Sequence, residues 1–214
     1  GDDLNGGERE GVRGQLLFEP NDDFNLRWIG DYNAEDSSTG TMVLYGAPQR
    51  YWDRAALAGG SPHRDPDDHK VNINSRQNVS VHQGGSSVEA NWNLNGGYTL
   101  TSISAYRYWH FNPANDADQL EVAVIDDYGY EVHDRQFSQE VRLASPGDQK
   151  FRWLAGLYHS TESVDGGFYS DFSEASTLKN WFSTTYKQDV ETTGVFFNLD
   201  YDLTSRLTLS GGLR

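Results

Sequence analysis

The sequence predicts an all-β fold, an antiparallel meander of about eight strands of the kind that forms a transmembrane β-barrel. Apolar and polar residues alternate along one stretch after another, as strands with two different faces require. The stretches run nine to fourteen residues, whereas globular strands average about 5–6 residues and about 9–11 tilted residues cross a bilayer. Short and long connections alternate strictly, which in outer-membrane barrels separates short periplasmic turns from long extracellular loops.

The expected strands follow from this alternation, while helical patterns are nearly absent. In the last stretch, for example, Leu207 and Leu209 alternate with Arg206, Thr208 and Ser210. We expect strands at Glu10–Glu19, Phe24–Tyr32, Ser86–Leu94, Tyr98–Phe111, Asp134–Ala144, Lys150–Thr161, Asp189–Tyr201 and Arg206–Arg214.

The connections between these strands fall into two classes. Four are tight and rich in the Pro, Asn, Asp, Gly and Ser residues that hairpin turns use. They are Pro20–Asp23, Asn95–Gly97, Ser145–Gln149 and Asp202–Ser205. The three long connections have 53, 22 and 27 residues and are Asn33–Gly85, Asn112–His133 and Glu162–Gln188.

The two faces of the strands differ in chemistry. Aromatic residues such as Trp28, Tyr106 and Trp153 lie toward strand ends on the apolar phase, where barrels carry interfacial girdles. The opposite phase carries Arg107, Glu140 and similar residues, which we expect to face a wet lumen. An antiparallel β-sandwich with one solvated face is the alternative; it accounts for the alternation, but not for the strand length or the loop asymmetry.

Composition excludes several classes of protein. There is no Cys, so no disulfide, zinc–thiolate site or thiol nucleophile can form. The 32 acidic residues against 17 basic ones give a net charge of -15, which opposes nucleic-acid binding. No apolar run approaches the length of a transmembrane helix. The chain starts without a targeting signal and ends inside an alternating run, so we expect an internal piece of a longer protein.

Four segments resemble TonB-dependent outer-membrane receptors. The stretch DVETTGVFFNLDYDLTSRLTLSGGLR, Asp189 to Arg214, resembles a mid-barrel hairpin, with its acidic, Thr-rich start, DLT turn and closing G-x-R. Arg9–Asn33, Tyr98–Trp109, and Arg135–Ser145 with Phe151–His159 resemble other hairpins of these barrels. The matches follow the family's order and cover roughly half of the residues, but none falls in the long loops.

The resemblance implies a 22-stranded barrel filled by an N-terminal plug domain, in the outer membrane of a Gram-negative bacterium. It implies outer-membrane lipid, lipopolysaccharide, the TonB complex and a scarce, large ligand as partners. Such ligands are siderophore-iron complexes, haem, cobalamin or oligosaccharides. Residues 1–214 would form part of the barrel domain. They contain neither plug nor TonB-contacting motif, so transport would belong to the parent protein.

Sites for catalysis, metals or cofactors are not expected. Ser176 and Lys179 fit an S-x-x-K pattern, but the companion motifs of such enzymes are missing. The loop from His63 to His69 holds carboxylates and histidines that ligate metals in other proteins. Arg64 and Lys70 interrupt this set, so a solvated polar loop is the better interpretation.

The long loops hold the candidate substrate contacts. These are aromatic and cationic groups that can stack on sugar or catecholate rings, or equally anchor the loops by packing. They are Arg50, Tyr51, Trp52, Tyr128, Tyr130 and Trp181.

The connection Asn112–His133 also carries six acidic residues and neither Lys nor Arg. This loop is either simply charged and soluble, or binds divalent cations that bridge lipopolysaccharide phosphates and repels anionic substrates.

Two other functions remain open from the sequence. A passive porin-type channel would share the strands but have no plug upstream of them. A soluble carbohydrate-binding or hydrolytic β-domain would need carboxylates converging in a cleft, and the sequence gives no sign of such convergence.

Overall fold

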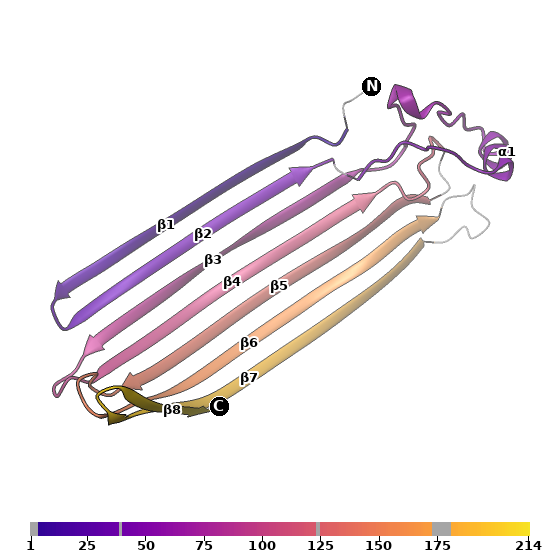
Figure 1. Cartoon of the computed structure of the whole chain (residues 1–214). Coiled ribbons are helices and arrows are strands. Elements are labelled where there is room, and N and C mark those ends of the chain that lie inside the picture. The colour runs from indigo at the N-terminus through magenta and orange to yellow at the C-terminus, as the bar shows by residue number, and fades with distance from the viewer. Residues whose placement is uncertain (1–3, 39, 123–124, 173–180) are drawn as a thin grey trace.

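The protein forms one eight-stranded antiparallel sheet in the order β1-β2-β3-β4-β5-β6-β7-β8 (Figure 1). The computed structural model describes residues 4–38, 40–122, 125–172 and 181–214, with backbone alone for 125–127 and 181. The strands are β1 Gly7–Asn21, β2 Phe24–Ser37, β3 Asn78–Asn93, β4 Thr99–Asn115, β5 Ile125–Ala144, β6 Phe151–Phe172, β7 Trp181–Thr204 and β8 Leu207–Leu213. The predicted meander is confirmed, and the sandwich alternative is wrong, because every described strand joins this sheet.

At the tight turns, the strand ends lie within a few residues of the predicted positions. At the long connections, strands such as β3 and β7 extend several residues further than predicted. β3 begins at Asn78 rather than Ser86, and β7 at Trp181 rather than Asp189. The long connections therefore shrink to residues 38–77, 116–124 and 173–180. The predicted loops were too long because backbone pairing continues where the expected alternation ends.

The alternation does not disappear at the loop ends; it changes phase. Along the middle of the strands the apolar residues share one face, which we call the apolar face, and the ion-pairing residues share the other, the polar face. Near the loops, Phe111 and Val132 lie on the polar face, whereas His110 and His133 lie on the apolar face. This change of phase explains why the sequence pattern placed the strand boundaries too early.

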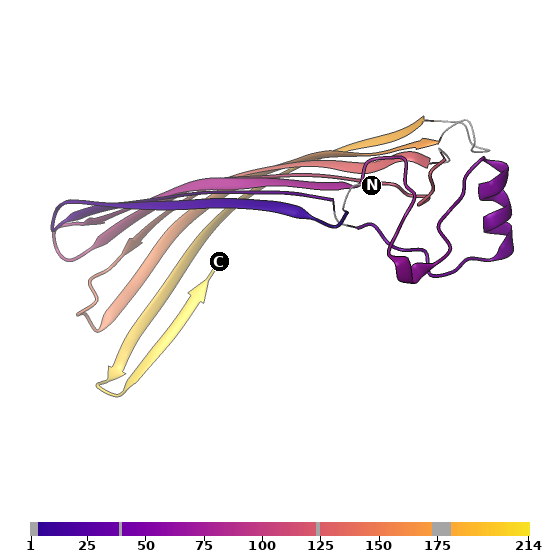
Figure 2. The same ribbon diagram turned by 90° about the horizontal axis from the view of Figure 1, so that it is seen from above.

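The sheet is open and curved, with β1 and β8 as its edges (Figures 1 and 2). β8 curls out of the plane of the first strands, as the right-handed twist of paired strands requires over many strands. On the side toward which β8 curls, Figure 2 shows the long connection that carries α1. The polar face is hollowed, with Glu140, Arg142 and Asn198 lining one depression of about 460 Å³.

The apolar face has almost no protein covering it. Val12, Leu16 and Val195 are each more than 60% exposed. Among the described residues, the buried apolar side chains are only those of Ala34, Ala55, Ala114 and Leu120. The sheet is therefore held together mainly by its backbone ladders and by cross-strand side-chain pairs rather than by a packed core.

Two short helical segments lie in the connection 38–77 and were not predicted. The α-helix α1, Gln49–Leu57, buries Ala55. The 3-10 helix η1, Pro66–Asp68, begins after Asp65, whose side chain accepts from the backbone N–H of Asp67. Neither segment has a long periodic pattern, so neither could be predicted from the sequence. No helix among the described residues has the length and apolarity needed to cross a membrane.

Candidate functional site

The polar face carries ion pairs between neighbouring strands. Arg27 and Glu89 lie directly opposite each other on β2 and β3, with 2.7 Å between guanidinium and carboxylate. Asn91 donates a further hydrogen bond of 2.9 Å to Glu89. The Glu89 carboxylate is thus held by one charged donor and one polar donor. The prediction that Arg107, Glu140 and their neighbours share one face is confirmed.

The pair between Arg107 and Asp31 explains a glycine in the middle of the sheet. Arg107 of β4 contacts both carboxylate oxygens of Asp31 of β2, at 3.0 and 3.1 Å. β3 lies between them, and its Gly85 is paired with both residues. A Cβ at this glycine would lie 2.9 Å from Cγ of Arg107 and 2.6 Å from the backbone oxygen of Tyr106. The bare backbone of Gly85 therefore lets the guanidinium cross β3.

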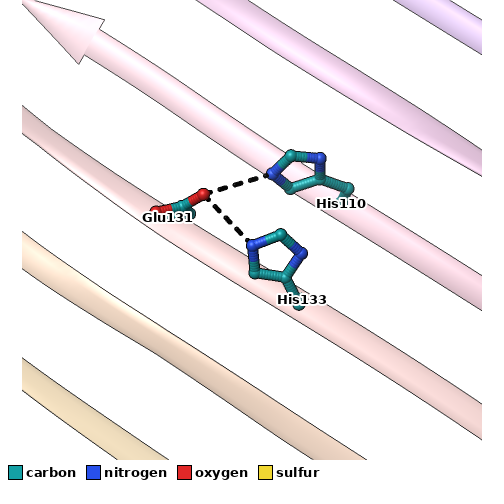
Figure 3. A group of neighbouring side chains, drawn as sticks. All are labelled: His110, Glu131 and His133. Atoms are coloured by element: carbon teal, nitrogen blue, oxygen red, sulfur yellow. Dashed lines mark hydrogen bonds and ion pairs between the residues drawn. The ribbon is translucent and has the colours of Figure 1, made fainter.

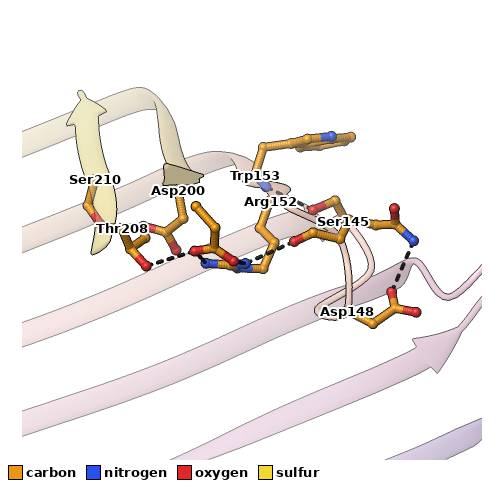
Figure 4. A network of polar contacts seen from close by, with 9 residues as sticks. Ser145, Asp148, Arg152, Trp153, Asp200, Thr208 and Ser210 are labelled. Carbon is orange, nitrogen blue, oxygen red and sulfur yellow. Dashed lines mark hydrogen bonds and ion pairs between the residues drawn. The ribbon is translucent and has the colours of Figure 1, made fainter. Parts of the chain in front are cut away.

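A second network joins three strands at the turn end of the polar face (Figure 4). Arg152 of β6 forms a bidentate pair with Asp202 of β7, at 2.6 and 2.9 Å. Thr208 of β8 donates to the same carboxylate at 2.7 Å, and Ser210 donates to Asp200 at 2.6 Å. These contacts fasten the short edge strand β8 to the rest of the sheet.

At the loop end, the polar face carries a group of four rings, which we call the aromatic cluster. It consists of Tyr128 and Tyr130 of β5, Phe168 of β6 and Phe182 of β7. The ring of Phe168 lies 5.0 Å from that of Tyr128, 5.2 Å from Tyr130 and 5.7 Å from Phe182, between centroids. Such tilted and edge-to-face arrangements are the ones aromatic pairs prefer. Tyr130 and Phe182 keep 39% and 49% of their surface exposed, so the cluster can still accept a ring.

The two tyrosines of the cluster are hydrogen-bonded to each other. Their hydroxyl oxygens lie 3.0 Å apart. This bond, and to a smaller extent burial, raises the pKa of Tyr128 above its ordinary value. Both effects favour the neutral phenol of Tyr128, which offers a hydroxyl group beside the rings of the cluster.

The first long connection brings together a different set of rings. Tyr51 and Trp52 of α1 meet edge to face at 5.1 Å, and the guanidinium of Arg64 lies over the Trp52 ring at 4.8 Å. Trp52 donates to the backbone oxygen of Ala47. Burial raises the pKa of Tyr51, so its phenol also stays neutral. These contacts mainly hold the loop in shape.

Acidic side chains of the second connection fasten the first. Asp116 is 1% exposed, and its carboxylate accepts from the backbone N–H groups of Asn74, Ser75 and Gln119, at 3.0, 3.3 and 2.8 Å. Glu121 accepts from the backbone N–H of Ser61 and from the side chain of Asn72. The interpretation of this connection as simply charged and soluble is therefore wrong for Asp116, because its carboxylate is buried and accepts hydrogen bonds from three backbone N–H groups.

The candidate substrate contacts thus separate into two groups. Tyr51 and Trp52 lie in the loop packing, whereas Tyr128 and Tyr130 join the aromatic cluster. Arg50 is exposed on α1, and Trp181 begins β7 with its side chain outside the described residues. Phe182 was also identified as an aromatic residue of the third long loop, but sequence reasoning missed Phe168, since its relation to Tyr130 depends on the register between β5 and β6.

The loop from His63 to His69, which lies within the described residues and which the sequence favours as a solvated polar loop, does not bring three metal-ligating side chains together. His63 pairs with Asp68, whereas Asp65 caps η1. In the described part of the chain, three metal-ligating side chains come together elsewhere, at His110, Glu131 and His133. Ser176 and Lys179 of the S-x-x-K pattern lie outside the described residues.

Comparison with known proteins supports the fold but not a closer relationship. No protein-family model matches the chain, and no curated protein matches it by sequence. Among solved structures, the ferric yersiniabactin uptake receptor FyuA from Yersinia pestis matches with a TM-score of 0.70 and 16% identity. The match covers 99% of this chain and 30% of the receptor, so the chain spans less than a third of its length. The resemblance to receptor barrels is thereby confirmed at the level of the fold.

Proposed function

We propose that this chain is part of the barrel wall of an outer-membrane receptor that takes up a scarce, ring-bearing ligand in a TonB-dependent manner. The apolar face contacts lipid and, at its loop end, lipopolysaccharide. The polar face lines the lumen, and the loops with the aromatic cluster form the outer mouth. The TonB complex acts through a plug region that lies elsewhere in the parent protein.

The observation that carries this proposal is the pairing of a bare apolar face with an ion-paired polar face in one sheet of long strands. In water, a sheet with exposed Leu16, Val195 and Leu209 would aggregate through that face and through its edges. In a bilayer, the same face is solvated by lipid while the polar face stays hydrated. The likeness of nearly the whole chain to an uptake receptor fits this arrangement.

The aromatic cluster supports a ligand with planar rings. Four rings on the lumen side of the loop ends offer stacking surfaces, and the hydroxyls of Tyr128 and Tyr130 offer hydrogen bonds. The net charge of -15 disfavours small, strongly anionic ligands. An iron-siderophore complex is therefore our first candidate, and the solved structure with this fold is a ferric yersiniabactin uptake receptor.

Uptake in cells tests the function. We expect cells that produce the intact parent protein to accumulate ferric siderophore, and to lose this accumulation when TonB is deleted. The purified protein should leave planar lipid bilayers electrically silent. Accumulation that is independent of TonB, together with steady ion conductance, would instead establish the passive-channel alternative.

A pair of matched substitutions tests the role of the cluster. Phe168→Leu removes the ring at its centre, while Phe137→Leu makes the same change on the apolar face. Because each aromatic pair contributes about 0.5–1.5 kcal/mol, we expect Phe168→Leu to weaken ligand binding by about tenfold and Phe137→Leu to leave it unchanged. Equal affinities in the two variants would contradict a binding role for the cluster.

A further inference from the structure

Two histidines and a glutamate meet on the apolar face, beyond Tyr108, the last aromatic residue of β4 on that face. His110 of β4 lies directly opposite His133 of β5, and Glu131 is two residues from His133 on the same face (Figure 3). On β4, His110 is the next residue of this face toward the loops after Tyr108. On β5, His133 has the same place after Arg135. The side chains are partly exposed, at 35% for His110, 33% for His133 and 52% for Glu131.

The three side chains point their ligand atoms at one another. Nε2 of His133 lies 3.1 Å from Oε1 of Glu131, and Nε2 of His110 lies 3.7 Å from the same oxygen (Figure 3). All three ligand atoms fall within 4.8 Å of one another. The imidazole rings are stacked, with centroids 4.1 Å apart and 19° between their planes.

These separations suit a small transition-metal ion. Zn²⁺ binds imidazole nitrogen and carboxylate oxygen at about 2.0–2.2 Å, so neighbouring ligands of a tetrahedral site lie about 3.3–3.5 Å apart. The observed distances from Glu131 to the two nitrogens lie on either side of that value. Small rotations of the exposed side chains would suffice to bring the three atoms around one ion.

An unsatisfied nitrogen points to the same conclusion. Nε2 of His110 is shielded from solvent and has no hydrogen-bond partner among the described residues. A metal bound at this nitrogen would occupy its free valence, and imidazole is a preferred ligand of Zn²⁺. Nearby His82 is less available, because its two nitrogens lie 3.0 Å from the Tyr32 hydroxyl and 3.1 Å from Oγ of Ser80.

The backbone gives such an ion a mechanical role. β4 and β5 pair at Phe111–Val132 and again at Ala114–Gly129, with no pairs between them. Pro113 lies in this gap and has no N–H to donate. A metal held by His110 on β4 and by Glu131 and His133 on β5 would join the two strands beside the interrupted ladder.

We propose that His110, Glu131 and His133 form a zinc site on the outer rim of the sheet, with two nitrogen ligands and one oxygen ligand. Three protein ligands leave the fourth tetrahedral position open to water or another small ligand. The site is on the opposite face from the aromatic cluster, so it is independent of the ligand site proposed above.

Calorimetric titration tests this site. The intact protein in detergent micelles is first stripped with a chelator and then titrated with Zn²⁺ alone. We expect one ion per chain with a dissociation constant of about 1–10 μM, in the range of an exposed three-ligand site. His133→Asn and Glu131→Gln should each weaken binding by at least about tenfold. His159→Asn is the matched control, since His159 also faces outward but bonds to Thr193, away from the cluster.

X-ray absorption spectroscopy of the zinc-loaded protein gives an independent result. We expect a first shell of nitrogen and oxygen with the scattering pattern of two imidazoles, reduced to one in His133→Asn. Circular dichroism establishes that each variant keeps its β-structure. Absence of saturable zinc binding by the unsubstituted protein, or equal affinity in His133→Asn and His159→Asn, would overturn the proposal.

Discussion

The buried carboxylate of Asp116 should control the attachment of the first long connection to the sheet. Asp116→Ala would leave the N–H groups of Asn74, Ser75 and Gln119 without the acceptor they share. A hydrogen bond to a charged group contributes about 1.5–3 kcal/mol, but amides near the surface partly recover by binding water. We therefore expect a loss of about 3 kcal/mol in local stability, which raises the population of the detached loop on the order of 100-fold.

Hydrogen exchange of the backbone amides measures this local opening directly. The amides of residues 74, 75 and 119 should exchange on the order of 100-fold faster in Asp116→Ala, while the mid-strand amides of β4 and β5 keep their protection. Asp53→Asn is the control, since Asp53 is exposed on α1 and accepts a single bond, from Gln49. Unchanged exchange at residues 74 and 75 in Asp116→Ala would refute the anchoring role.

Two further predictions concern the sheet and the aromatic cluster. Gly85→Ala should lower the free energy of unfolding by about 1–3 kcal/mol, because its Cβ would meet Arg107 and a backbone oxygen. Gly211→Ala is the control and should leave the free energy of unfolding unchanged, because nothing lies within 4 Å of its Cβ. Urea titrations in micelles compare the two variants. Tyr130→Phe should return the pKa of Tyr128 toward the ordinary value of about 10. Because the folded-state pKa is raised, the contribution of this bond to stability is complete below about pH 10 and is lost as pH rises through the folded-state value. The control is Tyr45→Phe, since Tyr45 is 89% exposed and lies outside the aromatic cluster. Phenolate absorbance should thus appear at lower pH in Tyr130→Phe than in Tyr45→Phe; coincident titrations would contradict the role of the bond.

The strands were predictable because a repeating physical requirement specifies them. A sheet with one apolar and one polar face needs alternation with a period of two residues, and hairpin turns need residues that tolerate tight backbones. Both signals are local, so the eight strands and four turns were found from the sequence. α1 was missed, since a nine-residue helix held by loop contacts does not need a long amphipathic pattern.

The sites were less predictable because they depend on register. Tyr128 and Tyr130 were identified as aromatic loop residues, but Phe168 is 38 residues from Tyr130 and becomes its neighbour only when β5 and β6 pair. The same holds for His110 and His133, which are separated by 23 residues in the sequence. A shift of one residue in either register would place the partners on opposite faces, so no local pattern could have revealed these groups.

The change of phase near the loops connects the missed strand ends to the proposed function. In a bilayer, an outward-facing residue must be apolar only where lipid surrounds the barrel. Beyond that zone the outer surface meets water, and the inner surface meets the loops that cover the mouth. Polar His110 and Glu131 can then face outward, while Phe111, Val132 and Phe168 turn toward the interior. In the proposed arrangement the two faces exchange their chemistry where their surroundings change, so the phase change on β4 and β5 would mark the outer boundary of the membrane.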